Sequence, residues 1–135
     1  MQTIQQAIQQ QQRCMQCWLP LKPSCLCDNV LSATTERIDV AVAMHYKEYG
    51  RTKNTAKIIP LTLPQNCQLY SHPIETPALL ERMRNGPSLV LWPGEESKPA
   101  SEYRDWLQQQ ESRVLLTVLD GTWVRRGMLA AHAPS

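Results

Sequence analysis

The sequence contains no phenylalanine, and aromatic residues make up only 6% of it. Leucine, isoleucine, valine and methionine must therefore fill most of the interior, although a hydrophobic share of 42% over 135 residues suffices for one packed domain. Long hydrophobic runs are also missing, since Val40–Met44 and Val114–Leu119 are far shorter than the roughly 20 residues that span a bilayer. Met1–Gln12 has no basic segment and no continuous apolar stretch, so we expect no signal peptide, no membrane contact and a cytoplasmic location.

Strong charge of one sign is absent too. The formal net charge of +2 permits contact with a polyanion but does not by itself indicate one. Two common nucleotide-binding signatures, G-x-G-x-x-G and G-x-x-x-x-G-K-[ST], do not occur. The sequence therefore gives no support to a dinucleotide site or a P-loop.

What the sequence does contain is an alternation of short apolar runs and helical patterns. Thr76 followed by Pro77 is typical of a helix start, and Pro60 is expected to end an earlier helix. Because the strands are continuous hydrophobic runs, we predict an α/β fold with a mostly parallel sheet covered on both faces. Expected strands cover residues 38–44, 68–70, 88–92 and 114–119, and expected helices cover residues 54–59, 77–84, 101–110 and 124–131.

Four of the five cysteines lie within fourteen residues, in the pattern C-x2-C-x7-C-x-C. Two tight turns can bring such thiolates into the tetrahedron that zinc prefers, and a four-cysteine site leaves no open position, so its role would be structural. A thioredoxin-like pair would leave two of these cysteines unexplained. Cys67 stands apart and is interpreted as an ordinary core thiol. We predict that zinc is held by Cys14, Cys17, Cys25 and Cys27, within a metal-binding module at residues 13–30 that follows a Gln-rich lead at 1–12 and precedes an α/β domain at 31–135.

Polar residues follow three of the expected strands, in His45–Glu48, Pro93–Glu96 and Asp120–Trp123. Ligands of open parallel sheets bind beyond the carboxyl ends of the strands, and parallel strands would bring these three segments to one edge. Taken singly, the residues also fit structural roles, because Asp120 or Thr122 can cap a following helix and a histidine at a strand end is often merely hydrogen-bonded. A basic set fits either a solvated face or phosphate contact: Lys47, Arg51, Lys53, Lys57, Arg125 and Arg126.

The order of these motifs is specific. The cysteine cluster is followed by His45 with Lys47-Glu48, Asn54-Thr55, Leu91–Gly94 and Leu119–Trp123. This order resembles that of the DTW-domain proteins, which are named for a D-x-T-W motif, here Asp120, Thr122 and Trp123. The resemblance runs from about Arg13 to Met128. Members of the family are tRNA-uridine aminocarboxypropyltransferases and are distantly similar to SPOUT methyltransferases, so the resemblance implies a SPOUT-like sheet.

The resemblance also implies a reaction, in which the 3-amino-3-carboxypropyl group of S-adenosylmethionine moves to N3 of a uridine in tRNA. Asp120 would accept the N3 proton or orient the base, and Trp123 would stack on uracil or adenine. Thr122 belongs to the same catalytic motif. The backbone at Pro93, Gly94 and Gly121 would approach the co-substrate, and Lys47, Lys53, Arg125 and Arg126 would contact tRNA phosphates.

Relatives continue well beyond the D-x-T-W motif, whereas this sequence ends at Ser135. We therefore expect the α/β domain to be incomplete at its C-terminal side. Two alternatives to the enzyme follow from this: a catalytically inactive RNA-binding or partner-binding module, and a fragment that exposes apolar surface and self-associates.

Overall fold

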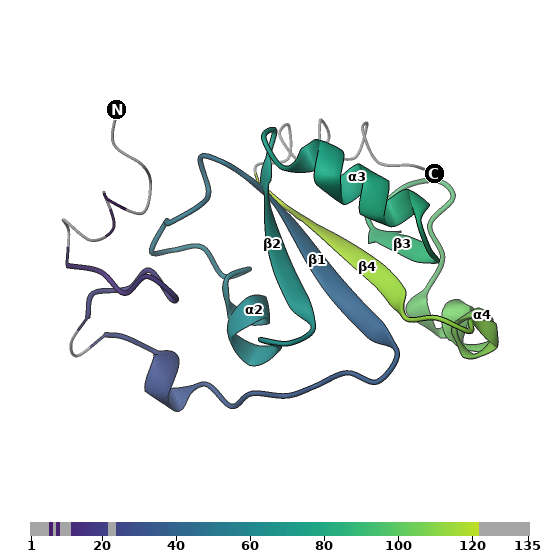
Figure 1. Cartoon of the computed structure of the whole chain (residues 1–135), viewed down its shortest axis with the longest axis horizontal. Helices are drawn as coiled ribbons and strands as arrows, with labels where there is room; N and C mark the ends of the chain where they lie inside the picture. Colours follow the sequence, from purple (N-terminus) through teal and green to yellow (C-terminus); the bar gives the residue numbers. More distant parts are fainter. Residues whose placement is uncertain (1–5, 7, 9–11, 22–23, 122–135) are drawn as a thin grey trace.

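The computed structural model describes residues 6, 8, 12–21 and 24–121. Within these residues one sheet contains four strands, β1 (Ile38–His45), β2 (Cys67–His72), β3 (Ser88–Leu91) and β4 (Val114–Asp120) (Figure 1). The strand order is β2-β1-β4-β3, and every neighbouring pair is parallel. The predicted parallel α/β sheet is confirmed, whereas the SPOUT-like arrangement stays a prediction.

The helices are short. Those whose bounds lie within the described residues are α2 (Ile58–Thr62), α3 (Thr76–Arg84) and α4 (Arg104–Gln109), with 3-10 turns η1 (Cys27–Asn29) and η2 (Ala100–Tyr103). In the described part of the chain no helix is long and apolar enough to cross a membrane. The helix expected at residues 124–131 lies outside the described residues.

The helix predicted at residues 54–59 is wrong, because α2 starts only at Ile58 and residues 54–57 belong to no helix. Pro60 does not end this helix but occupies its first turn. Proline is tolerated there because the first N–H groups of a helix have no acceptor within it.

The other two predicted helices need smaller corrections. The stretch 101–110 is divided, with η2 preceding α4. Thr76 does not cap α3 but is its first residue, and Glu75 holds the cap position. The hydroxyl of Thr76 instead lies 2.6 Å from Nδ1 of His72, so it ties α3 to the end of β2.

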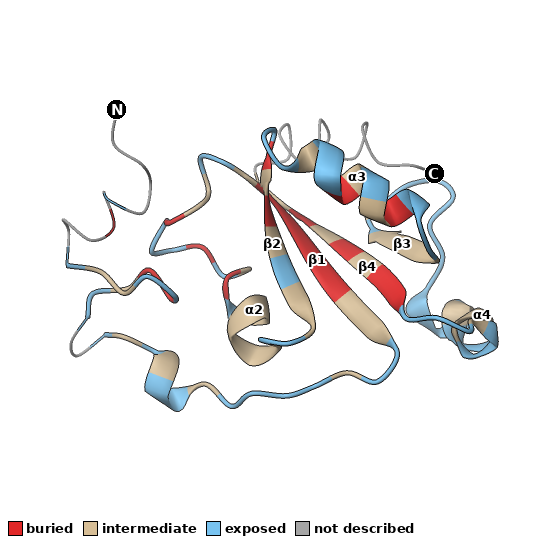
Figure 2. Ribbon diagram, in the orientation of Figure 1, coloured by how far each residue is buried: buried red, intermediate tan, exposed pale blue. Residues whose placement is uncertain are grey.

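The two faces of the sheet carry separate clusters of buried side chains, because successive residues of a strand point to opposite faces. Ala41 and Ala43 of β1 contact the cluster beneath α3, which contributes Leu79 and Met83. The other face, with Val40, Val42 and Met44, is covered by Trp18 of the cysteine segment and by residues in and around α2. Burial is concentrated in the two central strands, β1 and β4 (Figure 2).

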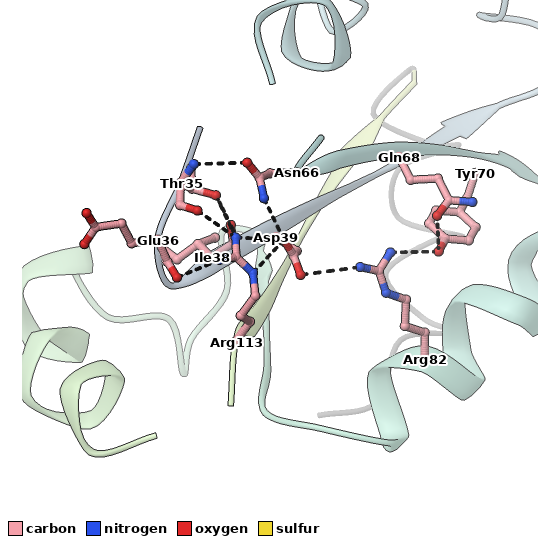
Figure 3. Close-up of polar contacts among 9 residues, drawn as sticks. All are labelled: Thr35, Glu36, Ile38, Asp39, Asn66, Gln68, Tyr70, Arg82 and Arg113. Carbon is pink, nitrogen blue, oxygen red and sulfur yellow. Dashed lines mark hydrogen bonds and ion pairs between the residues drawn. The ribbon is translucent and has the colours of Figure 1, made fainter. Parts of the chain in front are cut away.

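The amino ends of β1 and β4 are joined by Arg113 (Figure 3). Its guanidinium donates to the carboxylate of Asp39 at 3.0 Å and to the carbonyls of Thr35 and Glu36 at 2.9 and 2.6 Å. The hydrogen bond from Arg113 holds the pKa of Asp39 below its usual value, with smaller contributions from Asn66 and Arg82. This network stabilises the pairing of the two strands at their amino ends.

Candidate functional site

The four clustered cysteines meet as the sequence predicts. Their sulfur atoms all lie within 4.8 Å of one another. The Cys14 and Cys27 sulfurs are 3.5 Å apart, and those of Cys17 and Cys25 are 3.7 Å apart. Four thiolates about 2.3 Å from a tetrahedral zinc ion are separated by about 3.8 Å, so these residues fit that ion.

The local backbone of the first cysteine pair forms a tight knuckle. The N–H of Trp18 donates to the carbonyl of Cys14 at 2.9 Å, and the N–H of Gln16 donates to the Cys14 sulfur at 3.4 Å. Desolvation opposes ionisation of Cys14, but backbone N–H groups of Cys17 and Gln16 and the neighbouring thiols lower its pKa to about 7. Burial and the thiols of Cys14, Cys25 and Cys17 raise the pKa of Cys27. The four thiols cannot all ionise easily beside one another. A bound cation stabilises the thiolate form of each, so the tetrad is suited to hold one.

Trp18 connects this module to the rest of the chain. Its backbone adopts a φ of 64°, which few residues other than glycine accept, and its side chain is only 2% exposed. The indole lies 5.0 Å from the ring of Tyr49 and 5.7 Å from the ammonium of Lys57. Arg13 adds a hydrogen bond of 2.6 Å to the carbonyl of Gly50. The module is therefore packed onto the loop that follows β1.

Lys57 is buried to 3% exposure, and its ammonium donates to the carbonyl of Thr52 at 2.8 Å. Desolvation lowers the pKa of this lysine. The Lys57 side chain therefore links two parts of the loop that follows β1. It lies beneath Trp18 and is not a surface cation. The basic set inferred from the sequence loses this member, because a buried ammonium bonded to backbone cannot contact a phosphate.

The carboxyl edge of the sheet brings together residues from several segments. His45 lies opposite His72, and Met44 lies opposite Asp120. Asn54, which is 7% exposed, donates from Nδ2 to Oδ2 of Asp120 at 2.5 Å, across 66 positions of sequence. Asp120, the first residue of the D-x-T-W motif, is therefore held at the end of β4 by a buried amide.

The expected co-substrate loop leaves the sheet at the same edge. Leu91 of β3 lies opposite Val118 of β4, so Pro93 follows at the level of Asp120. Pro93 and Gly94 are exposed. Ser97 closes the turn, since its hydroxyl donates to the carbonyl of Gly94 at 2.7 Å. Added side-chain carbon at Gly94 would meet no atom within 4 Å, so the space beside this backbone is open.

Two further residues have identifiable structural environments. The N–H of Lys47 donates to Nδ1 of His45 at 3.2 Å, so that nitrogen acts as an acceptor and the proton of a neutral ring sits on Nε2. Cys67 packs against the cluster around Trp18, and burial raises its pKa to about 11. It stays a thiol at neutral pH.

A basic cleft of about 530 Å³ lies between the cysteine module and the loop after β1. Lys53 was expected from the sequence to contact RNA, and it lines this cleft. The sequence did not indicate that Arg13 contacts RNA, because Arg13 stands next to Cys14 in the cysteine module. Arg51 is also bonded to Glu48 at 3.2 Å. The cleft is lined by Ile8, Arg13, Tyr49, Gly50, Arg51, Thr52 and Lys53.

The remaining predicted site residues are distributed differently. Lys47 is exposed, with its ammonium 5.9 Å from the ring of Tyr46, and does not line the basic cleft. Gly121 follows β4 directly. Thr122, Trp123, Arg125 and Arg126 lie outside the described residues.

Comparison with known proteins adds one finding. A family model described as the DTW domain matches residues 11–133. No curated protein and no solved structure matches the chain. The matched range includes the cysteine module, the carboxyl edge of the sheet and every residue that lines the basic cleft except Ile8.

Proposed function

The chain belongs to the DTW-domain family, and from this membership we propose that it is a tRNA-modifying transferase that uses S-adenosylmethionine. The group transferred is 3-amino-3-carboxypropyl, and the acceptor is N3 of a uridine. The observation that carries the proposal is the position of Asp120. Its carboxylate is held at the carboxyl edge of a parallel sheet by buried Asn54, which directly follows the cleft residue Lys53 in sequence.

The proposed reaction needs a base and good alignment more than it needs a metal ion. A bond forms between N3 of uridine and the methylene carbon beside the sulfonium, while the carbon–sulfur bond breaks and sulfur keeps the electron pair. The N3 proton passes to Asp120. Because the sulfonium is already an activated leaving group, most of the acceleration comes from holding the two substrates in line. Thr122 and Trp123 complete the proposed catalytic set, with Trp123 stacking on a base.

The open backbone at Pro93 and Gly94, together with Gly121, is the proposed contact with the co-substrate. A residue without a side chain lets a ligand approach the main chain closely, and the space beside Gly94 is open. The four-cysteine module holds zinc in a structural role, because four protein ligands leave no coordination position for substrate. Thiolate ligation suits the reducing cytoplasm, where tRNA is also found.

Phosphates of tRNA are proposed to contact Lys47 and Lys53, with Arg125 and Arg126 as further candidates. Arg13 and Arg51 join this set because they line the same cleft as Lys53. Cations around one concave surface attract a polyanion more strongly than scattered ones because their fields add, although Glu48 offsets part of the charge of Arg51 here.

Nucleoside mass spectrometry of unmodified tRNA incubated with this chain and S-adenosylmethionine tests the proposed function. We expect a uridine that is heavier by one aminocarboxypropyl group. A longer family member that is active on the same tRNA serves as the control. If that control modifies the tRNA and this chain does not, the transferase proposal fails.

The second candidate function, an RNA-binding module without activity, is favoured by one observation: the basic cleft is formed entirely by residues before Asn54. It can therefore bind RNA whether or not transfer occurs. A thermal shift with S-adenosylmethionine separates the two functions, since only a chain that binds the co-substrate is stabilised by it.

Both functions predict that the double variant Arg51→Ala, Lys53→Ala binds tRNA about tenfold more weakly at low salt. The slope of log affinity against log salt should fall by about 1 to 2, because fewer counterions are released. Fluorescence anisotropy over a salt series provides the measurement.

The matched control for this charge change is the double variant Arg84→Ala, Arg104→Ala. These arginines are also exposed but lie on α3 and α4, away from the cleft. Equal weakening by both double variants would show that only net charge matters, and would remove the cleft as the RNA contact.

A further inference from the structure

We infer that Asn54 is a positioning residue, which fixes the carboxylate of Asp120 for the transfer step; the inference rests on the proposed function. Asn54 belongs to no helix or strand and is nevertheless 7% exposed. Burial of an amide is unfavourable unless its groups are hydrogen-bonded. Its two partners therefore show what the side chain does.

The two ends of the Asn54 amide are used at once. Nδ2 donates to Oδ2 of Asp120 at 2.5 Å, and Oδ1 accepts the N–H of Lys57 at 3.1 Å. Only a side chain with both a donor and an acceptor can bridge a carboxylate and a backbone N–H in this way. With Oδ2 of Asp120 engaged, Oδ1 is the oxygen that receives the proton of the uridine.

Asn54 is itself held from behind. Its backbone N–H donates to the carbonyl of Arg51 at 3.2 Å, which closes a turn. Lys57, which donates to the Asn54 side chain, is buried beneath Trp18 of the cysteine module. A continuous series of contacts therefore runs from the metal module through Lys57 and Asn54 to Asp120.

The chain offers a matched pair at the opposite edge of the sheet. Asn66 donates from Nδ2 to Oδ1 of Asp39 at 3.3 Å, and its own Oδ1 accepts the N–H of Thr35 at 3.1 Å (Figure 3). This pair has the same chemistry as Asn54 with Asp120 but lies at the amino ends of the strands. Asn66→Ala is therefore the control for loss of a bridging amide, here a partly buried one.

The bond itself is tested by the side-chain amide resonance of Asn54 in ¹⁵N-labelled protein. We expect a downfield-shifted Nδ2 proton that returns to the ordinary range in Asp120→Ala. The same resonance should be unaffected in Asn66→Ala. An Asn54 resonance that does not respond to Asp120→Ala overturns the inference.

The catalytic consequence is tested by a double-mutant cycle in steady-state kinetics. Asn54→Ala should lower kcat about 10- to 100-fold with KM for both substrates little changed, because a displaced base affects the transition state more than binding. The double variant Asn54→Ala, Asp120→Ala should be no slower than Asp120→Ala alone. Additive losses would show that Asn54 acts independently of Asp120, which contradicts the inference.

Asn54→Asp separates positioning from folding. Aspartate keeps the acceptor for the Lys57 N–H but replaces the donor to Asp120 with a second carboxylate oxygen. Its kcat should fall at least as far as that of Asn54→Ala, whereas Asn66→Ala should keep the wild-type kcat per folded molecule. Unchanged kcat in a folded Asn54→Asp chain refutes the positioning role.

Failure of the inference can be told from failure of the proposed function. A wild-type chain that transfers nothing to tRNA overturns the function, and with it the catalytic part of the inference, while the Asn54 resonance still decides whether the amide holds Asp120. If the wild type is active and Asn54→Ala has a normal kcat, the proposed function holds and only the positioning role of Asn54 is refuted.

Discussion

The Asp120→Asn variant is expected to transfer the aminocarboxypropyl group about 100-fold to 10,000-fold more slowly than the wild type, with tRNA affinity nearly unchanged. An amide has the shape of the carboxylate but cannot accept the N3 proton. It still offers an oxygen to the Nδ2 group of Asn54, which donates to Asp120 at 2.5 Å, so the loop after β1 should stay in place. Single-turnover mass spectrometry measures the rate, and anisotropy measures tRNA binding.

The control for this substitution is Asp39→Asn at the other edge of the sheet. Asp39 is paired with Arg113 at 2.9 Å, so its loss should lower the melting temperature without changing the transfer rate per folded molecule. Parallel loss of transfer and tRNA binding in Asp120→Asn would contradict a base and indicate a structural role for Asp120, such as a helix cap.

Cys25→Ser is expected to have the largest effect on stability. Removal of one of four thiolates should release zinc and lower the melting temperature by about 10 °C or more, because binding of a structural zinc ion contributes several kcal/mol to folding. The loss should extend beyond the module, since Trp18 belongs to the buried cluster that covers one face of the sheet. Elemental analysis and differential scanning calorimetry provide the two measurements.

The matched control is Cys67→Ser, which removes a thiol that lies outside the tetrad. This variant should keep its zinc and lose only the stability of one partly buried side chain. Equal metal content in Cys25→Ser and wild-type protein would refute the four-cysteine zinc site.

The sheet could be predicted from the sequence because the evidence for it is local. Ile38–His45 and Val114–Asp120 are apolar runs dense in β-branched and aliphatic residues, and both are strands close to their expected bounds. The cysteine tetrad was predictable for the same reason, since all four ligands lie in one short segment whose spacing reflects the coordination geometry.

The helix predicted at residues 54–59 failed because tertiary contacts override local propensity there. Asn54 and Lys57 look like polar helix residues, but both are buried and bonded to distant partners or to the loop itself. The helix begins at Ile58, after the residues that make these contacts.

The candidate site was only partly visible from the sequence. The expectation of parallel strands correctly predicted that Asp120 and Pro93 would reach the carboxyl edge of the sheet. The pair Asn54–Asp120 spans 66 positions and follows no periodicity, so no spacing rule could reveal it. Arg13 was missed because its contribution depends on how the cysteine module packs against Gly50.

The order of strands in the sheet has a consequence for synthesis of the chain. The central pair joins β1 to β4, and Arg113 and Thr35, which tie these strands together, are 78 positions apart. At about 5–20 residues per second on the ribosome, β1 is synthesised on the order of 4 to 16 s before its partner β4. Parallel pairs form slowly because the intervening chain must be ordered first. During this interval β1 of the nascent chain has no β4 to pair with. Its apolar side chains are then most exposed to aggregation, and chaperone binding is most useful.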